Sequence, residues 1–131
     1  MNRPRDNESS YEQRDLGDAM CLALAGDIDL DNASLLRAHL QTAAQTRETI
    51  IVDLTGLRYL DSSGVNVLLD GQRKLALGGR MIVLAAPSPT IRKILSLLHL
   101  EELIPVFSSV EEALTYLRAA GHSEEFALVG S

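Results

Sequence analysis

Residues 49–69 read TIIVDLTGLRYLDSSGVNVLL, and they join an apolar strand to the beginning of a helix. The strand is predicted over Thr49–Leu54, where consecutive aliphatic residues are typical of a parallel strand covered on both faces. A helix is predicted to start at the polar quartet Asp61–Gly64, to run to about Leu77 and to end at Gly78-Gly79. Its expected inner face consists of Val65, Leu68, Leu69 and Ala76. A buried strand followed at once by a helix indicates an α/β fold.

The same alternation of strand and helix continues on both sides of these residues. Further strands are predicted at Met20–Ala25 (ended by Gly26), Arg80–Ala85 and Ile104–Phe107, with a weak edge strand at Tyr11–Arg14 that forms a hairpin through Asp15–Asp18. Three further helices are predicted, with starts at Asp31 or Asn32, at Ser88-Pro89, and at a capping box of Ser108 and Glu111. This order predicts one α/β domain with a mixed, mostly parallel sheet of four to five strands and four helices packed on it.

The bulk composition is that of one acidic globular unit. A length of 131 residues is typical of a single domain, and 46% hydrophobic residues are ordinary for a protein with a packed core. The net charge of -6 argues against binding to nucleic acid or to an anionic membrane, because both need clustered Lys and Arg. The chain opens without a signal peptide and has no apolar run of the ~20 residues that cross a bilayer, so we expect a cytoplasmic protein.

The two ends of the chain are predicted to lie outside the domain. Residues 1–10 are polar after Met1 and are expected to form a disordered leader. Residues 121–131 begin with Gly121, which is expected to stop the last helix, and they are predicted to form a flexible tail. The domain itself is therefore expected to cover residues 11–120.

Alternating aspartates in GDIDLDNASLL, residues 26–36, invite a metal-binding interpretation. A calcium-binding EF-hand loop starting at Asp27 needs glycine and glutamate where this chain has Asn32 and Ala38. Asp27-Ile-Asp29 after a strand also resembles the haloacid-dehalogenase-type phosphotransferases, yet no second acidic cluster follows a later strand. We favour turn and capping hydrogen bonds for Asp27, Asp29 and Asp31, and we expect no Mg²⁺-dependent hydrolysis of a phosphomonoester.

The other chemistry-bearing residues lack the spacing that catalysis or metal binding requires. Cys21 is the single cysteine and lies in an apolar run, so a buried, unreactive thiol is expected. His39, His99 and His122 are too far apart along the chain to pair on a helix. The sequence has neither a G-x-S-x-G nucleophile elbow nor a Walker-type phosphate loop. We therefore predict no catalytic residue, no metal site and no cofactor.

The quartet Asp61-Ser62-Ser63-Gly64 has two interpretations. Asp61 can cap the predicted helix by accepting a hydrogen bond from the backbone of the first turn. One cap does not explain two serines and a glycine, which are expected to keep that turn narrow and accessible. A hydroxyl at a helix start is also a good phosphorylation site, because the helix N-terminus favours the phosphate's charge of about −1.5 to −2. The local residues leave capping and phosphorylation both open.

Taken together, these elements resemble the STAS domain, named for sulfate transporters and anti-sigma factor antagonists. The resemblance spans roughly residues 20–118, and it is nearest to the stand-alone anti-sigma factor antagonists. Four segments carry it in order: Gly26-Asp-Ile-Asp29, Ile51-Val-Asp-Leu54, Tyr59-Leu-Asp-Ser-Ser-Gly64 and Gly78-Gly-Arg-Met-Ile-Val83.

The resemblance implies a phosphorylation-switched binding protein that is itself no enzyme. In that family the serine directly after the aspartate, here Ser62 and less plausibly Ser63, is phosphorylated by a partner that is both anti-sigma factor and serine kinase. The unphosphorylated antagonist binds this partner and frees the sigma factor, the phosphorylated form dissociates, and a PP2C-type phosphatase resets it. The implied partner-binding residues are Asp29, Asp61, Ser62, Ser63, Gly64, Val65 and Asn66.

Acidic residues and Asn66 are expected to surround Ser62. The aspartates at 27, 29, 31 and 61 will cluster if both strand-to-helix turns open at the same end of the sheet, and a phosphate added there will repel an acidic partner surface or nucleotide. Asn66 stands where the family often has glycine, which bears on the choice of kinase more than on the mechanism. A non-switching STAS subunit of a stressosome or lipid-transport assembly is the alternative function.

Overall fold

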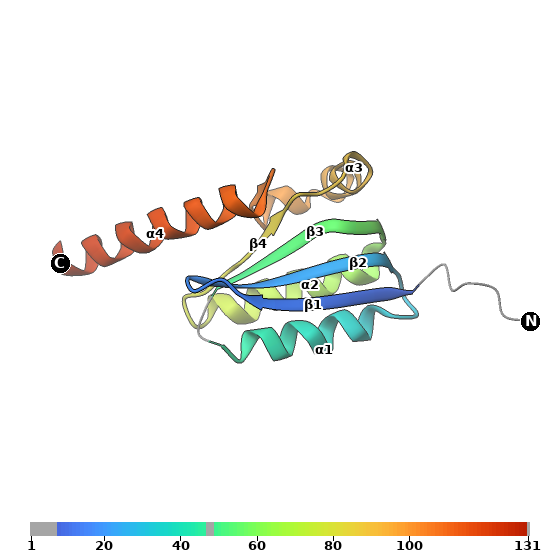
Figure 1. The fold of residues 1–131 in the computed structure, drawn as a ribbon, viewed down its shortest axis with the longest axis horizontal. Coiled ribbons are helices and arrows are strands. Elements are labelled where there is room, and N and C mark those ends of the chain that lie inside the picture. The colour runs from blue at the N-terminus through green and yellow to red at the C-terminus, as the bar shows by residue number, and fades with distance from the viewer. Residues whose placement is uncertain (1–7, 47–48, 131) are drawn as a thin grey trace, which may run out of the picture.

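Five strands and four α-helices form the computed structural model, which describes residues 8–46 and 49–130, with side chains as far as residue 120 (Figure 1). The strands are β1 (Ser9–Asp15), β2 (Ala19–Ile28), β3 (Thr49–Leu60), β4 (Ile82–Ala85) and β5 (Val106–Phe107). The helices are α1 (Ala33–Ala44), α2 (Ser62–Ala76), α3 (Pro89–Leu97) and α4 (Val110–Gly130), with a 3₁₀ turn, η1, at Leu100–Glu102.

The five strands form one sheet in the order β1-β2-β3-β4-β5. β1 runs antiparallel to β2 as a hairpin, and β2, β3, β4 and β5 pair in parallel. Helices α1 and α2 lie side by side on one face of the sheet, and α4 lies on the other face (Figure 1). The predicted single α/β domain with a mixed, mostly parallel sheet is therefore confirmed.

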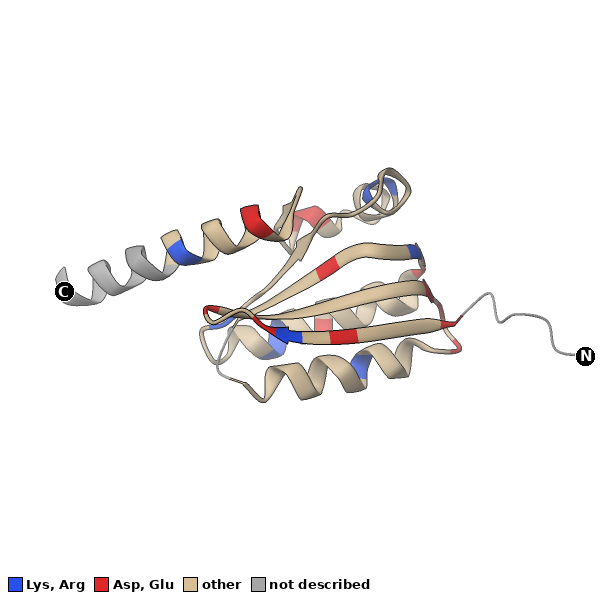
Figure 2. Cartoon of the chain, in the orientation of Figure 1, with Lys and Arg blue, Asp and Glu red and all other residues tan. Residues whose placement is uncertain are grey.

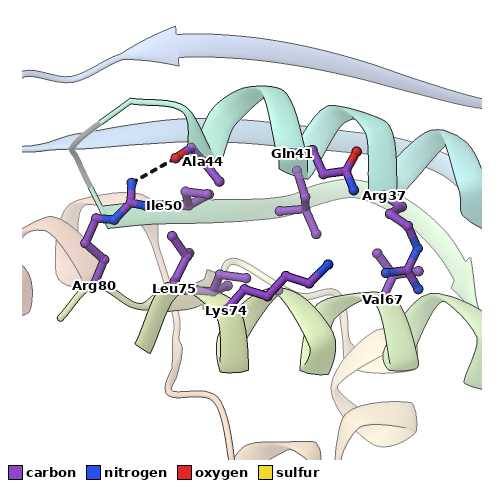
Figure 3. Close-up of a pocket in the computed structure, with 11 residues that line it drawn as sticks. Arg37, Gln41, Ala44, Ile50, Val67, Lys74, Leu75 and Arg80 are labelled. Atoms are coloured by element: carbon purple, nitrogen blue, oxygen red, sulfur yellow. Dashed lines mark hydrogen bonds between the residues drawn. The ribbon is translucent and has the colours of Figure 1, made fainter. Parts of the chain in front are cut away.

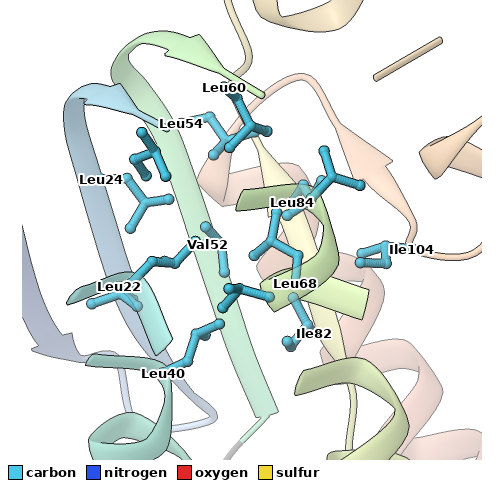
Figure 4. Packing of buried hydrophobic residues seen from close by; sticks show 14 of the residues in the cluster. Leu22, Leu24, Leu40, Val52, Leu54, Leu60, Leu68, Ile82, Leu84 and Ile104 are labelled. Carbon is cyan, nitrogen blue, oxygen red and sulfur yellow. The ribbon is translucent and has the colours of Figure 1, made fainter. Parts of the chain in front are cut away.

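The main core lies between the sheet and the helices α1, α2 and α3. It is built almost entirely from aliphatic side chains, whose alternation along β2, β3 and β4 places every second residue on this face (Figure 4). Its fully buried members include Leu22, Leu24, Val52, Leu54, Leu68 and Leu84. A smaller cluster on the opposite face packs Ile51, Val83 and Ala85 against Ala113 of α4. Strand β3 is thus covered on both faces, as its sequence predicts.

Strands β2 and β3 are longer than predicted, and both reach the site described below. Gly26 does not end β2, because the register between β2 and β3 shifts near this residue and pairing then continues as far as Ile28 and Leu60. Gly26 has a φ of +88°, and a Cβ atom built on it would lie 2.1 Å from the carbonyl oxygen of Glu8. Only glycine fits this conformation and this close approach of two backbones.

The ends of the domain differ from the prediction. β1 begins at Ser9, so Ser9 and Ser10 belong to the sheet and not to a leader; residues 1–7 lie outside the described residues. Gly121 does not stop α4, whose backbone continues to Gly130. A glycine inside a helix costs only about 1 kcal/mol, and the Glu, Ala and Leu residues that follow favour the helix.

Some helix details are also corrected. Asn32 is the N-cap position of α1 but makes no side-chain cap hydrogen bond. The capping interaction of α4 lies one residue later than predicted, because Ser109 Oγ accepts from the backbone N–H of Glu112. On α2, Leu75 is buried and Ala76 is exposed, the reverse of the expected inner face. Ser88 does cap α3, with Pro89 in its first turn, as predicted.

Candidate functional site

The first turn of α2 starts directly where β3 ends, and Asp61 holds it in place. Asp61 is the N-cap, with an extended backbone, and its Oδ1 accepts hydrogen bonds from the backbone N–H of Ser63 at 2.8 Å and of Gly64 at 3.4 Å. Two N–H groups of the helix start are thereby satisfied by a carboxylate, which the helix dipole also favours. The predicted capping role of Asp61 is confirmed.

Gly64 has a packing role that the sequence did not reveal. It is buried, and a Cβ atom built on it would lie 2.4 Å from Cδ1 of Leu60 and 2.9 Å from Cγ2 of Ile28. Since Leu60 ends β3 and Ile28 ends β2, the missing side chain lets α2 approach the ends of both strands. The glycine therefore sets the position of the helix start.

The two serines of the quartet differ in exposure. Ser62 is exposed, whereas Ser63 is partly buried and its backbone N–H is bonded to Asp61. In the part of the chain that the structure describes, neither hydroxyl makes a hydrogen bond to another residue. The Ser62 hydroxyl is the more accessible of the two to another protein.

Both strand-to-helix turns open at the same end of the sheet. The backbone N–H of Asp61 donates to the carbonyl oxygen of Ile28 at 3.1 Å, so the turn after β3 is bonded directly to the end of β2. Acidic positions gather at this end (Figure 2). Arg58 lies 3.3 Å from Asp27 Oδ1 and offsets one of the carboxylates. The predicted convergence of the two turns is therefore observed, with a cation among them.

The turn between β2 and α1 is built from its own polar side chains. The Oδ1 atom of Asp29 accepts from the backbone N–H of Asp31 at 3.0 Å. The buried Asn32 accepts from the N–H of Asp29 at 2.9 Å and donates to the carbonyl oxygen of Asp27 at 2.8 Å. These are the turn hydrogen bonds that we favoured over a phosphotransferase. Among the described residues no three His, Cys, Asp or Glu side chains gather as a metal site.

The other predicted contact residues fall into two groups. Asn66 is exposed on the first turns of α2, beside Ser62. Val65 is 5% exposed and packs into the core next to Gly64, so these two residues shape the site from beneath. Asp29 and Asp61 are partly exposed.

Two exposed apolar side chains near the site were missed by the sequence reasoning. Leu30, in the turn after β2, is 78% exposed, and Tyr59, two residues before Asp61, is 47% exposed. The register pairs Tyr59 with Asp27, so both side chains belong to the end of the sheet where Ser62 lies. The sequence did not indicate that these two residues are exposed, because large apolar residues are usually expected in the core.

The cysteine is buried as predicted, and two of the three histidines contact neighbouring side chains. Cys21 is fully buried, and this burial raises the pKa of its thiol. His39 stacks on Tyr11 of β1, with ring centroids 4.1 Å apart, and His99 lies 3.1 Å from a Glu102 carboxylate oxygen. The side chain of His122 lies outside the described residues.

The family follows from a comparison of the whole chain with known domains. The model of the STAS domain matches residues 10–113, which include every strand except the first residue of β1, both turns of the site and the start of α4. The chain belongs to the STAS domain family. The polar quartet at the start of α2 is therefore part of a STAS fold, as the sequence indicated.

Individual STAS proteins are similar to this chain over most of its length. The anti-sigma-F factor antagonist RsfB of Mycobacterium tuberculosis is 30% identical over 98 residues, which are 74% of this chain and 80% of the relative. The anti-sigma F factor antagonist of Lysinibacillus sphaericus is 40% identical over 80 residues, 59% of this chain and 68% of the relative.

Two solved structures give the same result for the fold. The anti-sigma factor antagonist SpoIIAA in its unphosphorylated form is 28% identical, with a TM-score of 0.71 over 84% of this chain and 97% of SpoIIAA. The phosphorylated form of SpoIIAA, a Bacillus cell fate determinant, has a TM-score of 0.62 and is 27% identical over 82% of this chain and 99% of that one. Within the described residues, no helix has the length and apolar character needed to cross a bilayer.

Proposed function

We propose that this STAS protein is an anti-sigma factor antagonist whose binding to an anti-sigma factor is ended by phosphorylation of Ser62. The observation that carries the proposal is the exposed Ser62 hydroxyl, without a hydrogen-bond partner among the described residues, on a helix start that Asp61 holds in place. The relatives that bear this name support it, as does the similarity to a protein solved both with and without phosphate.

The position of Ser62 suits a switch that changes charge without unfolding the domain. A phosphate at a helix N-terminus is stabilised by nearby backbone N–H groups and by the macrodipole. Phosphorylation adds a charge of about −1.5 to −2 at the end of the sheet where Asp29 and Asp61 already lie. The added charge repels an acidic partner surface, or the nucleotide bound by a kinase, while the core stays intact.

The contact surface that we propose surrounds Ser62 and is partly apolar. Leu30 and Tyr59 present exposed apolar side chains, and Asp29 and Asn66 present polar ones. Large apolar groups at the centre of a contact, ringed by polar ones, supply most of the affinity in many protein interfaces. Gly64 and Val65 are buried beneath this surface, and they fix the position of α2 on the ends of β2 and β3.

In this proposal the chain is a substrate and a binding partner, and the chemistry belongs to other proteins. The partner is an anti-sigma factor with serine kinase activity, and a PP2C-type phosphatase restores the hydroxyl. Both reactions take place in the cytoplasm, where the sigma factor acts. Ser63 is the less suitable acceptor because it is partly buried.

Calorimetric titration with the anti-sigma factor kinase of the same organism tests the switch. Ser62→Ala is expected to bind as tightly as the parent chain, and Ser62→Asp is expected to bind at least about tenfold more weakly, a difference of about 1.4 kcal/mol. The matched pair Ser108→Ala and Ser108→Asp changes an exposed serine ahead of α4 and is expected to leave affinity unchanged. Equal affinities for the two Ser62 variants would reject the switch and favour a non-switching STAS subunit.

A further inference from the structure

A pocket lies between α1 and α2, on the side of these helices that faces the sheet (Figure 3). We call it the α1–α2 pocket. The space that it encloses, about 470 Å³, includes a part that is open to solvent. The floor is apolar and consists of Leu40, Ala44, Ile50, Val67, Leu75 and Ile82.

The walls of the α1–α2 pocket are fixed by contacts outside its floor. Gln72 donates to the carbonyl oxygen of Ile82 at 3.1 Å and accepts from the Ile82 N–H at 2.6 Å, which ties α2 to β4. Arg80 donates to the carbonyl oxygens of Ala44 and Thr46, and so holds the end of α1 (Figure 3). Because both helices are held by hydrogen bonds to neighbouring elements, the pocket is pre-formed.

The rim of the α1–α2 pocket is cationic, which is unusual in a chain of net charge -6. Arg37 is bonded to Asp70 at 3.2 Å, and Arg80 is engaged by carbonyl oxygens that carry no full charge. Lys74 lines the pocket from α2, and among the described residues it has no hydrogen-bond or ion-pair partner. Among the described residues, neither Lys74 nor Arg80 has a carboxylate partner, and both lie beside the apolar floor.

We propose that the α1–α2 pocket binds a small amphipathic anion, of the class of a medium-chain carboxylate. The alkyl chain lies on the apolar floor, because removing apolar surface from water is favourable. The carboxylate lies at Lys74, in the last turn of α2, and Arg80 contributes positive potential from the C-terminal end of α1. This inference rests on the pocket alone, and it stands or falls independently of phosphorylation at Ser62.

Titration of the full chain with sodium octanoate, followed by the amide shifts of the ¹⁵N-labelled protein, tests the proposal. Octanoate is expected to shift amides of α1 and α2 around the pocket in a saturable manner. Acetate has the carboxylate without the chain, and 1-octanol has the chain without the charge, so both are expected to bind more weakly. Lys74→Met keeps the apolar stem and is expected to weaken octanoate binding about two- to fivefold while leaving octanol binding unchanged.

Lys93→Met is the matched control. Lys93 is an exposed lysine on α3 that does not line the pocket, so this variant is expected to bind octanoate like the parent chain. The proposal is overturned if octanoate shifts no amides of α1 and α2, if octanol binds as tightly as octanoate, or if Lys74→Met and Lys93→Met bind octanoate equally.

Discussion

Replacing Gly64 by alanine is expected to destabilise the domain, although alanine is the better helix former. The added Cβ would lie 2.4 Å from Leu60 Cδ1 and 2.9 Å from Ile28 Cγ2, both closer than real Cβ atoms come. Overpacking of a tight core typically costs about 1–3 kcal/mol. The gain in helix propensity offsets at most about 1 kcal/mol of this. We therefore expect a net loss of about 1–2 kcal/mol in the free energy of unfolding.

Urea and thermal unfolding, followed by circular dichroism, measure this loss. The expected fall in Tm is roughly 3–10 °C for a domain of this size. Gly78→Ala is the matched control, because a Cβ there would meet no atom closer than 3.7 Å and the residue is exposed. If Gly64→Ala unfolds at the same urea concentration as the parent chain, the close approach of α2 to the two strand ends is not the reason for glycine at this position.

Three further predictions concern the cap at Asp61, the close backbone approach at Gly26 and the buried thiol of Cys21. Asp61→Ala is expected to lower the free energy of unfolding by about 1 kcal/mol, and Asp61→Asn, which keeps a capping oxygen, by less; equal losses in urea would contradict the cap. Gly26→Ala is expected to cost more than Gly17→Ala in the same assay, because both have a left-handed φ but only Gly26 has a backbone oxygen 2.1 Å from the new Cβ; equal costs would contradict the clash. Cys21 is expected to react with a disulfide reagent much faster in urea than in the native state, since burial raises the pKa of its thiol. For the same reason, the stability that the buried thiol contributes is present below the ordinary pKa of a thiol and is lost as the pH rises towards the raised pKa. Equal reaction rates in urea and in the native state would refute both expectations.

The sequence predicted the layers and the cap because both depend on local patterns. Aliphatic runs mark Thr49–Leu54 as a strand covered on both faces, and an aspartate before two serines marks a helix start. Ser88-Pro89 gave the start of α3 for the same reason. These signals lie within a few residues of the feature they predict, so no knowledge of the tertiary structure was needed.

The remaining features depend on contacts between residues distant in the chain. Gly26 was expected to end β2, but the backbone of Glu8 and the pairing with β3 carry the strand through it. Gly64 was expected to keep the first turn of α2 accessible, but its neighbours are side chains of β2 and β3. The α1–α2 pocket left no trace in the sequence, because its lining residues come from two helices and two strands.

The proposed function depends most directly on which hydroxyl receives a phosphate. The chain is incubated with ATP and the anti-sigma factor kinase of its own organism, and its peptides are analysed by mass spectrometry. The account predicts one phosphate on Ser62, and none on the Ser62→Ala variant. A phosphate on Ser63 with Ser62 unmodified, or no phosphate on the chain at all, would contradict it.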